Sequence, residues 1–339
     1  MKKFTAGILS VAVLGASALG FAACGEKGEG YTVYAPDGAP ALSLVKALAE
    51  DDGTFDFHVV ASSVIAAQVS FEEESKNADF CVLPVNVASL KLGTGENYKM
   101  LGTVTNGNFY FLTTNGEEIT SPSDLVGKKV GVVQLANVPG LTFQSVLKES
   151  DVSYQILESV EAEGDGEKVN LVNLGTDATN VTPAFGCDYY LCPEPAVSLK
   201  SAGTAGKPEG KRFSYAGSLQ TLYGGENGYP QAVLVAKKSV LEKDKSAAQK
   251  LVGYVRDCGE YLETAKVGDV LSLLSACRTE GLTPAFTEKN LNATVIGRCS
   301  VRFTASADCK TRVNEFLTRL AEISPNAVKA VSDSFYYAG

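Results

Sequence analysis

The chain has 339 residues, of which 45% are hydrophobic and 20% are charged, and its formal net charge is −9. This length exceeds what one hydrophobic core usually supports, so two domains are expected, and the apolar content is typical of a globular protein and not of a disordered one. No run of Lys or Arg with interleaved aromatic residues occurs, so nucleic acid is not an expected partner.

The N-terminus has the layout of a secretory signal peptide. Two lysines precede a short apolar segment of small residues, and the polar stretch GEKGEG follows Cys24. The apolar segment is short and rich in Gly and Ala, which disfavours a membrane-spanning helix. We therefore expect residues 1–23 to be a signal peptide and residues 24–30 to be a flexible tether.

The residues before the expected cut resemble a bacterial lipoprotein box, Phe-Ala-Ala-Cys, in which Phe21 replaces the usual Leu. The resemblance implies cleavage before Cys24 and a diacylglycerol thioether on its sulfur. Two acyl chains such as palmitate, at about 0.8 kcal/mol per buried methylene, hold a protein stably on a membrane. The mature chain would be anchored at the extracytoplasmic face of the cell membrane, and loss of Lys2 and Lys3 would lower its net charge to −11 from −9. An ordinary signal-peptidase site is the alternative.

Two pairs of segments repeat each other in outline. Residues 79–91, DFCVLPVNVASLK, and residues 188–200, DYYLCPEPAVSLK, both run from Asp through four apolar residues to Pro and into a helix ending in Ser-Leu-Lys. A four-residue apolar run is typical of a strand covered on both faces, and Pro ends it. Residues 33–48 and 130–147 likewise both read as strand, Pro/Gly-rich loop and helix.

Between the members of each pair lies another strand and helical pattern, at residues 55–71 and 168–185. Alternating strands and helices predict a mainly parallel sheet with helices on its faces. We infer two α/β domains of like plan, with chance similarity between βα units as the alternative.

Gly- and Asn-rich stretches mark the domain boundaries, at residues 105–108 and 223–230. After residue 240 the pattern becomes helical, with Leu251, Val255 and Cys258 on one face that needs a partner surface. The simplest partner is the first domain. We therefore expect one domain from residues 31–106 with 228–339, a second from 107–227, and two crossings between them.

SPSDLVGKKVGVV, in which Ser121 caps a short helix and Gly127 ends it, resembles the entry to the second lobe in extracytoplasmic solute-binding proteins of ABC importers. The repeated segments and the closing GRCSVRF and SPNAVKAVSDSFYY resemble the nitrate, sulfonate and thiamine-precursor branch of that family. The resemblance implies a type II periplasmic-binding fold, with two doubly wound lobes joined by two crossover segments. It also implies a monomer that closes on a small molecule and delivers it to a permease driven by a separate ATPase.

The chain has no P-loop of its own, since the glycine spacing in residues 203–211 is too short and Pro208 follows Lys207. In open α/β sheets, ligands bind beyond the carboxyl ends of the strands. Polar and small residues at the predicted strand ends therefore form the candidate ligand-binding set: Asp37, Gly38, Ala39, Ser62, Ser63, Asn86, Asn108, Gln134, Asn137, Thr176, Asp177 and Glu194. Some also have local roles to fill, since Ser62 or Ser63, and Thr176 or Asp177, are expected to cap helices.

Glu194 bears on the type of ligand, because a buried carboxylate needs a donor. The donor is either a protein Lys or Arg, or an amine-like edge of the ligand. The second case favours a pyrimidine or other nitrogenous heterocycle over a sulfonate- or nitrate-like anion. Arg298 or Arg302 would instead meet an anion, and both also fit as surface charges. Five aromatic residues either stack on a ring or belong to the core: Phe109, Tyr110, Tyr189, Tyr190 and Tyr223.

The residue inventory argues against an enzyme. His58 is the one histidine and lies in the strand-like FDFHVV, where a satisfied core residue is expected, so no Ser–His or Cys–His pair is predicted. We expect no catalytic residue, metal or cofactor. The carboxylates of Asp37, Asp177 and Glu194 leave one alternative, a surface-anchored enzyme on the same fold acting on a small heterocycle. An adhesin-like module that binds macromolecules is a third class.

Seven cysteines follow Cys24, and an odd count argues against a complete disulfide framework. Cys187 and Cys192 lie five apart in a predicted strand, so they face opposite sides and cannot share a metal. Cys299 with Cys309 is one candidate disulfide. Most of the seven are expected to be buried as small apolar residues.

Overall fold

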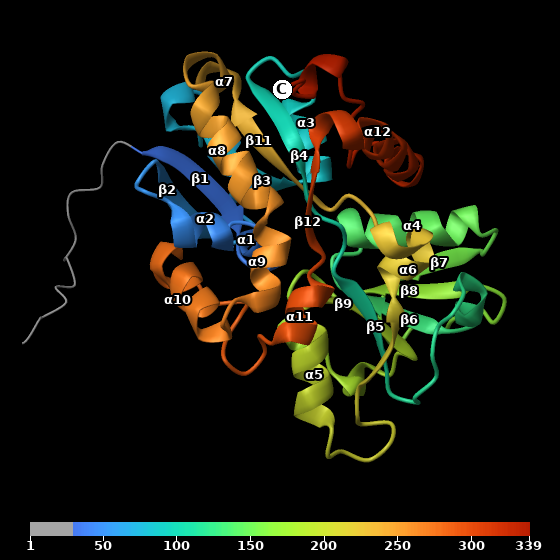
Figure 1. Ribbon diagram of the computed structural model, residues 1–339. Coiled ribbons are helices and arrows are strands. Elements are labelled where there is room, and N and C mark those ends of the chain that lie inside the picture. Colours follow the sequence, from blue (N-terminus) through green and yellow to red (C-terminus); the bar gives the residue numbers. More distant parts are fainter. Residues whose placement is uncertain (1–29) are drawn as a thin grey trace, which may run out of the picture.

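Two six-stranded β-sheets form the framework of the protein, each with helices packed against it (Figure 1). The structure is a computed structural model, and it describes residues 30–339. The predicted signal peptide, Cys24 and nearly all of the tether lie outside these residues. Within residues 30–339, no helix combines the length and the apolar character needed to cross a membrane.

The first sheet has the strand order β12-β4-β11-β3-β1-β2. Strands β2, β1 and β3 run parallel, whereas β11, β4 and β12 pair antiparallel with their neighbours. Their bounds are β1 Tyr31–Pro36, β2 Phe55–Val60, β3 Phe80–Pro84, β4 Tyr98–Thr105, β11 Ala232–Lys237 and β12 Val301–Ala305.

The second sheet has the order β10-β5-β9-β6-β8-β7, in which β9, β6, β8 and β7 are parallel. Its strands are β5 Phe109–Thr113, β6 Lys129–Val132, β7 Tyr154–Leu157, β8 Val169–Asn173, β9 Tyr189–Pro193 and β10 Ser214–Ser218. The predicted two-lobed α/β fold is confirmed. Both sheets are mixed because β5 and β11 enter at the carboxyl edge, where the chain arrives from the other lobe, and so run antiparallel to β9 and β3.

The repeated sequence segments occupy equivalent places in the two sheets. Strand order β3-β1-β2 in the first matches β9-β6-β8 in the second. Asp79 accepts a hydrogen bond from the backbone N–H of Thr32 at 3.0 Å, and Asp188 accepts one from the backbone N–H of Lys129 at 2.7 Å. Each Asp thus precedes its strand and binds the first residues of the neighbouring parallel strand. The sequence repeat is therefore a structural repeat that fixes strand register.

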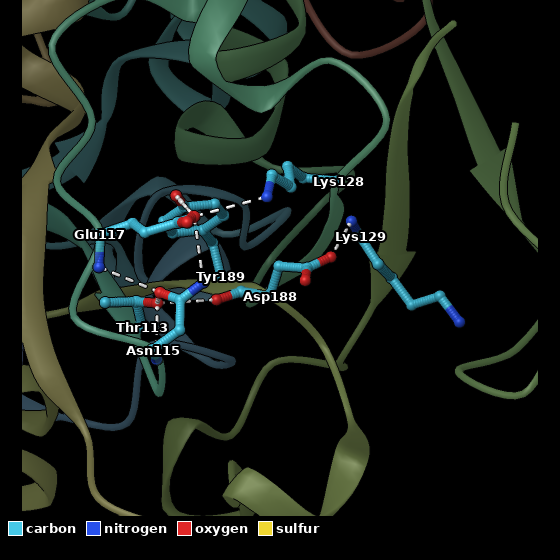
Figure 2. Close-up of polar contacts among 7 residues, drawn as sticks. All are labelled: Thr113, Asn115, Glu117, Lys128, Lys129, Asp188 and Tyr189. Carbon is cyan, nitrogen blue, oxygen red and sulfur yellow. Dashed lines mark hydrogen bonds and ion pairs between the residues drawn. The ribbon is translucent and has the colours of Figure 1, made fainter. Parts of the chain in front are cut away.

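Figure 2 shows the surroundings of Asp188 at the amino end of β9. Thr113 donates its hydroxyl to the backbone oxygen of Asp188 at 3.0 Å, and the Tyr189 hydroxyl donates to Glu117 at 3.3 Å. Lys128 pairs with the same Glu117 carboxylate at 3.4 Å, a surface contact that solvent screens. These contacts join β5, β6 and β9 at the end of the sheet opposite to the strand carboxyl ends.

The helices segregate with the two sheets (Figure 1). Around the second sheet lie α4 Val138–Glu149, α5 Ala196–Thr204 and α6 Leu219–Gly224. The remaining helices are α1 Ala39–Leu42, α2 Val45–Glu50, α3 Val85–Leu92, α7 Lys238–Lys243, α8 Lys245–Arg256, α9 Cys258–Thr264, α10 Val267–Cys277, α11 Ala293–Arg298 and α12 Ser306–Ile323. Leu251, Val255 and Cys258 share a buried cluster with Val33 and Leu42, which confirms that the helical tail packs on the first sheet.

Two crossover segments connect the two sheets, and they lie next to each other. The first, residues 106–108, leads from β4 to β5, and the second, residues 228–231, leads into β11. Tyr229 donates its backbone N–H to the Asn106 carbonyl at 3.3 Å, which holds the two segments together. Gly228 has φ +56°, and a Cβ there would overlap that same carbonyl oxygen, so only glycine fits.

The seven cysteines within residues 30–339 are all free thiols, so Cys299 and Cys309 do not form the candidate disulfide. Six are buried and Cys277 is half-buried. Burial raises the pKa of Cys187 and of Cys258 to about 11, which keeps both thiols protonated at neutral pH. The expectation that most of these cysteines are small apolar core residues is confirmed.

Candidate functional site

One parallel strand of each sheet, β3 in the first and β9 in the second, ends beside the crossover segments. The backbone N–H of Val85, after β3, donates to the Gln231 carbonyl at 3.0 Å. That of Glu194, after β9, donates to the Asn108 carbonyl at 2.9 Å, and the Gln231 amide donates to the Asn108 side chain at 2.9 Å. We call the residues that follow β1, β2, β3, β6, β8 and β9 the strand-end region. All twelve predicted ligand-binding residues lie in it or in the first crossover.

The loop after β1 is built around Asp37. One carboxylate oxygen accepts from the Gly38 N–H at 3.0 Å, and the other accepts from the Ala285 N–H at 2.8 Å. The side chain is only 7% exposed, so the protein itself already supplies donors to both oxygens. Gly38 has φ +107° and starts α1, with Pro40 in the first turn. No atom lies within 4 Å of where a Cβ on Gly38 would stand, so the space beside this glycine is open.

Ser62 and Ser63 follow β2 and are exposed. The prediction that one of them caps a helix is wrong, because the next helix is a 3₁₀ turn over Ile65–Val69 whose cap position is Val64. Residues 62–64 instead form the turn that leads from β2 into this 3₁₀ helix. Asn86, after β3, is buried and donates to the carbonyl of Ala327 at 3.4 Å, near the C-terminal end of the chain.

In the second lobe, the loops after β6 and β8 are joined by a hydrogen bond of 2.7 Å from the backbone N–H of Gln134 to the Gly175 carbonyl. Asn137 precedes α4 and is exposed, as is Thr176. Asp177 caps the 3₁₀ turn Ala178–Asn180 by accepting from the Thr179 N–H at 2.8 Å, which confirms the capping prediction for Asp177. Asn137 and Thr176 thus present an amide and a hydroxyl at the surface of the strand-end region.

Glu194 is the most buried charged group of the set, with no exposed side-chain area. Its carboxylate accepts from the backbone N–H and the hydroxyl of Ser198, at 3.1 and 2.8 Å. Arg298 of α11 donates to the same carboxylate at 3.2 Å. The sequence predicted either a protein Lys or Arg, or an amine-like edge of the ligand, as the donor to Glu194. In the structure this donor is a protein arginine.

Where it reaches Glu194, Arg298 lies over two neighbouring tyrosines of the second sheet, whose ring centres are 5.9 Å apart. Its guanidinium lies 4.6 Å from the ring centre of Tyr215 and 5.4 Å from that of Tyr110. The Tyr110 hydroxyl donates to the Arg298 carbonyl at 2.9 Å, and burial raises the pKa of that hydroxyl, so it stays a donor. α11 packs its Val295 into the core of the first sheet. One helix therefore links the core of one lobe to the strand-end region of the other (Figure 1).

Arg278, which sequence reasoning missed, lies beside Asp37. Its side chain is 10% exposed, and its Nε is 3.7 Å from a carboxylate oxygen of Asp37. Within residues 30–339, neither Nε nor Nη2 of Arg278 has a hydrogen-bond partner. No local sequence signal marks this position, because its neighbour Asp37 lies in a distant part of the chain.

A cavity of about 630 Å³ lies where both crossovers meet α9 and α11, lined among others by Asn106, Gly228, Gln220, Glu260 and Gly297. None of the twelve predicted ligand-binding residues lines this cavity. It is therefore distinct from the strand-end region.

Two features bear on catalysis. Within the part of the chain that the structure describes, no group of three His, Cys, Asp or Glu side chains could hold a metal ion. His58 shares a hydrogen bond of 3.0 Å with Asp56 and stacks on Tyr34 with ring centres 4.4 Å apart. The histidine is thus satisfied, as predicted, but it is 25% exposed and not in the core.

Residues 67–190 match the model of a family described as NMT1/THI5 like. A comparison with curated proteins gives no match. An ABC transporter protein from Parabacteroides distasonis is similar in structure, with a TM-score of 0.68 and 16% identity over 91% of this chain and 98% of its own.

Two sulfonate-binding proteins are also similar in structure. The periplasmic aliphatic sulphonate binding protein of Escherichia coli has a TM-score of 0.57 and 13% identity, covering 92% of this chain and 94% of its own. The alkanesulfonate-binding protein of Xanthomonas axonopodis pv. citri, bound to MOPS, has a TM-score of 0.54 and 14% identity, covering 88% and 94%. The TM-scores of 0.54 to 0.68 show a shared fold with these proteins. The fold class predicted from the sequence is confirmed, and the match of residues 67–190 agrees with the family resemblance seen in the sequence.

Proposed function

Because residues 67–190 match the NMT1/THI5-like family and the whole chain has the fold of ABC-importer binding proteins, we propose that this protein captures a small organic solute outside the cytoplasm. The solute would bind in the strand-end region and pass to a membrane permease driven by a separate ATPase. The lobes are residues 31–106 with 228–339, and residues 107–227.

The observation that carries this proposal is that β3 of the first sheet and β9 of the second end beside the same two crossovers. Val85 of the first lobe and Glu194 of the second each bond a crossover residue, and Gln231 and Asn108 bond each other. Polar residues at the ends of β3 and β9, Asn86 and Glu194, thus lie next to one pair of connections between the lobes. In such an arrangement, a solute that contacts both lobes favours the closed form, because only the closed form offers both sets of contacts.

The contact between Arg298 and Glu194 would itself stabilise the closed form, independently of the solute. It joins α11 to β9 through an ion pair and two cation–π contacts. The solute then only has to add the remaining free energy that separates open from closed forms. Since differential affinity sets the size of any such shift, a pre-formed contact lowers what the solute must supply.

The ligand class is less constrained by Glu194 than the sequence suggested. Ser198 and Arg298 already satisfy its carboxylate, so no amine or amidine edge of a ligand is required there. The argument for a nitrogenous heterocycle loses its main support. The similar proteins named for sulfonates favour an anionic small molecule instead.

The anchor is a further part of the proposal. A lipoprotein box ending at Cys24 would tether the chain to the extracytoplasmic face of the membrane, next to the permease it serves. The tether of residues 24–30 is polar and glycine-rich, which suits a protein that must reorient toward its partner.

An enzyme on the same fold remains the competing class. It would use the carboxylates of Asp37, Asp177 or Glu194, yet each accepts hydrogen bonds from its own surroundings. A solute recovered unchanged from the purified protein supports capture, whereas turnover of that solute supports the enzyme.

The direct test is a thermal-shift screen of the full-length chain with sulfonates, nitrate, pyrimidines and thiamine derivatives. A solute at a hundredfold excess over its Kd is expected to add about 2.7 kcal/mol to stability. Small-angle scattering of the same samples should show a smaller radius of gyration with the bound solute, because closure brings the lobes together. Stabilisation without any compaction would contradict hinge closure.

A further inference from the structure

We infer that Arg278 is the recognition point for an oxyanion group, such as a carboxylate or sulfonate, carried by the captured solute. This inference rests on the proposed function and names the chemistry of its ligand. It rests on two observations: buried N–H donors of Arg278 have no hydrogen-bond partner among the described residues, and Arg278 lies at the carboxyl ends of parallel strands.

The Arg278 guanidinium is buried and mostly unused. Nine-tenths of the side chain is shielded from solvent. Neither Nε nor Nη2 has a hydrogen-bond partner among the described residues. Buried donors are almost always paired in native proteins, so two orphaned N–H groups on one cation need a missing acceptor.

The two orphaned nitrogens have a particular geometry. Nε and Nη2 carry N–H bonds that run parallel along one edge of the planar guanidinium. This edge matches the spacing of two oxygens of a carboxylate, sulfonate or phosphate, and such bidentate pairs are stronger and more directional than single hydrogen bonds. The chemistry left open at Arg278 is therefore that of an oxyanion.

Asp37 does not fill this place. Its nearer oxygen is 3.7 Å from Nε, beyond hydrogen-bond distance. The carboxylate is held where it is by the backbone N–H groups of Gly38 and Ala285, at 3.0 and 2.8 Å. Asp37 thus balances the charge of the arginine when no solute is bound, while leaving the donor edge unused.

Arg278 is also in the right place. It forms a bridge with Val59 at the end of β2, where the N–H of Thr279 donates to the Val59 carbonyl at 2.9 Å. The N–H of Asp37, after β1, donates to Val60 at 2.9 Å. Arg278 therefore lies at the carboxyl ends of two adjacent parallel strands, the edge at which α/β sheets bind ligands. The open space beside Gly38 lies next to Asp37 in the same loop.

Other partly or fully buried cations of the chain differ from Arg278. Arg312 donates to the Asn106 side chain at 3.0 Å and to the Gly228 carbonyl at 2.9 Å. Lys237 is paired with Asp79 at 3.1 Å. Arg312 and Lys237 both have protein acceptors at hydrogen-bond distance. Among the described residues, the Nε and Nη2 atoms of Arg278 have none.

The test uses the full-length chain and matched probes. Alkanesulfonates and alkanecarboxylates of two to six carbons are compared with the corresponding primary amides by titration calorimetry. The natural chain should bind at least one acid more than tenfold tighter than its amide. Arg278→Lys keeps the charge but loses the parallel fork, and it should weaken that acid at least tenfold. Arg212→Gln, which removes an exposed arginine between α5 and β10, should leave the affinity unchanged.

A second measurement does not depend on a variant folding. The ¹⁵N–¹H resonance of the Arg278 Nε group, assigned by its loss in Arg278→Lys or by triple-resonance methods, should shift on titration with the acid and not with the amide. Equal affinity of the natural chain and Arg278→Lys, or an unmoved Nε resonance at saturation, overturns the inference. A neutral solute that binds tightly and compacts the protein overturns this inference alone and leaves the proposed function intact. Failure of every solute to bind overturns both.

Discussion

Arg298 and Glu194 lie 104 residues apart in the sequence and form an ion pair of 3.2 Å between α11 and the end of β9. The two partners differ in exposure, since the arginine side chain is 30% exposed and the glutamate has no exposed area. The pair thus joins a solvent-reachable cation of one lobe to a fully enclosed anion of the other.

This asymmetry makes the two single substitutions unequal. Arg298→Met leaves an enclosed carboxylate with only Ser198 as donor, and we expect a loss of about 2–4 kcal/mol in the free energy of unfolding. Glu194→Gln keeps the Ser198 contacts and leaves an arginine that can reach water, so about 1 kcal/mol is expected. Urea unfolding of both variants and of the double variant measures the coupling. Additive effects would show that the pair contributes nothing of its own.

The same variants report on closure. If the pair supports the closed form, Arg298→Met should enlarge the radius of gyration of the solute-free protein in small-angle scattering. Arg212→Gln serves as control, because Arg212 is exposed and lies within the second lobe, between α5 and β10. An unchanged radius in Arg298→Met would mean that the ion pair stabilises the lobes without affecting their arrangement.

Local features of the chain were predictable from the sequence. The repeated Asp-apolar-Pro segments gave β3 and β9, because a buried strand and its Pro stop are encoded within six residues. The short helix after Ser121 was predicted with its cap, which the structure shows as a capping box with Asp124. The cap at Ser62 or Ser63 was wrong because hydroxyl residues after a strand fit a turn equally well.

The partners within the candidate site were not predictable. Ala285 donates to Asp37 across 248 residues, and Arg298 reaches Glu194 across 104. Neither contact has a local pattern, since both depend on where the tail returns to the strand-end region after packing on the first sheet. The antiparallel entry of β5 and β11 escaped prediction for the same reason, because it follows from the crossovers and not from the strands themselves.

The two equivalent aspartates of the structural repeat should differ in their contribution to stability. Asp79 pairs with Lys237, whose side chain is 7% exposed, in addition to binding Thr32. Asp79→Ala would leave that lysine buried without a partner, so we expect a loss of about 3–5 kcal/mol. Asp188→Ala removes a single charged cap of a backbone N–H and should cost about 1–2 kcal/mol.

Chemical unfolding of both variants measures this difference. Asp333→Ala is the matched control, because Asp333 also pairs with a lysine, Lys310, but its side chain is 86% exposed and should change stability by less than about 0.5 kcal/mol. Equal losses at Asp79 and Asp188 would show that the buried lysine finds another partner or reaches solvent.

Lipid attachment at Cys24 is tested by Cys24→Ser in a bacterial host. The unaltered chain should incorporate labelled palmitate and sediment with membranes, because two acyl chains bind stably. The variant should lose both the label and the membrane association, while its solute affinity stays the same. A variant that still sediments with membranes would favour an uncleaved spanning segment, and an unlabelled natural chain would favour ordinary signal-peptidase cleavage.

The crossover at Gly228 should be intolerant of any side chain. Gly228 has φ +56°, and a Cβ would collide with the Asn106 carbonyl oxygen of the other crossover, so Gly228→Ala combines backbone strain with overlap. Gly225→Ala is the matched control, since φ is +83° there but no atom lies within 4 Å of the added Cβ. Strain alone costs about 1–3 kcal/mol, which is the loss expected for Gly225→Ala. Gly228→Ala should lose about 2 kcal/mol more and should weaken solute binding, because the displaced crossover alters the hinge. Equal stability and equal affinity in the two variants would show that the crossovers separate without cost, and that the lobes do not depend on their contact.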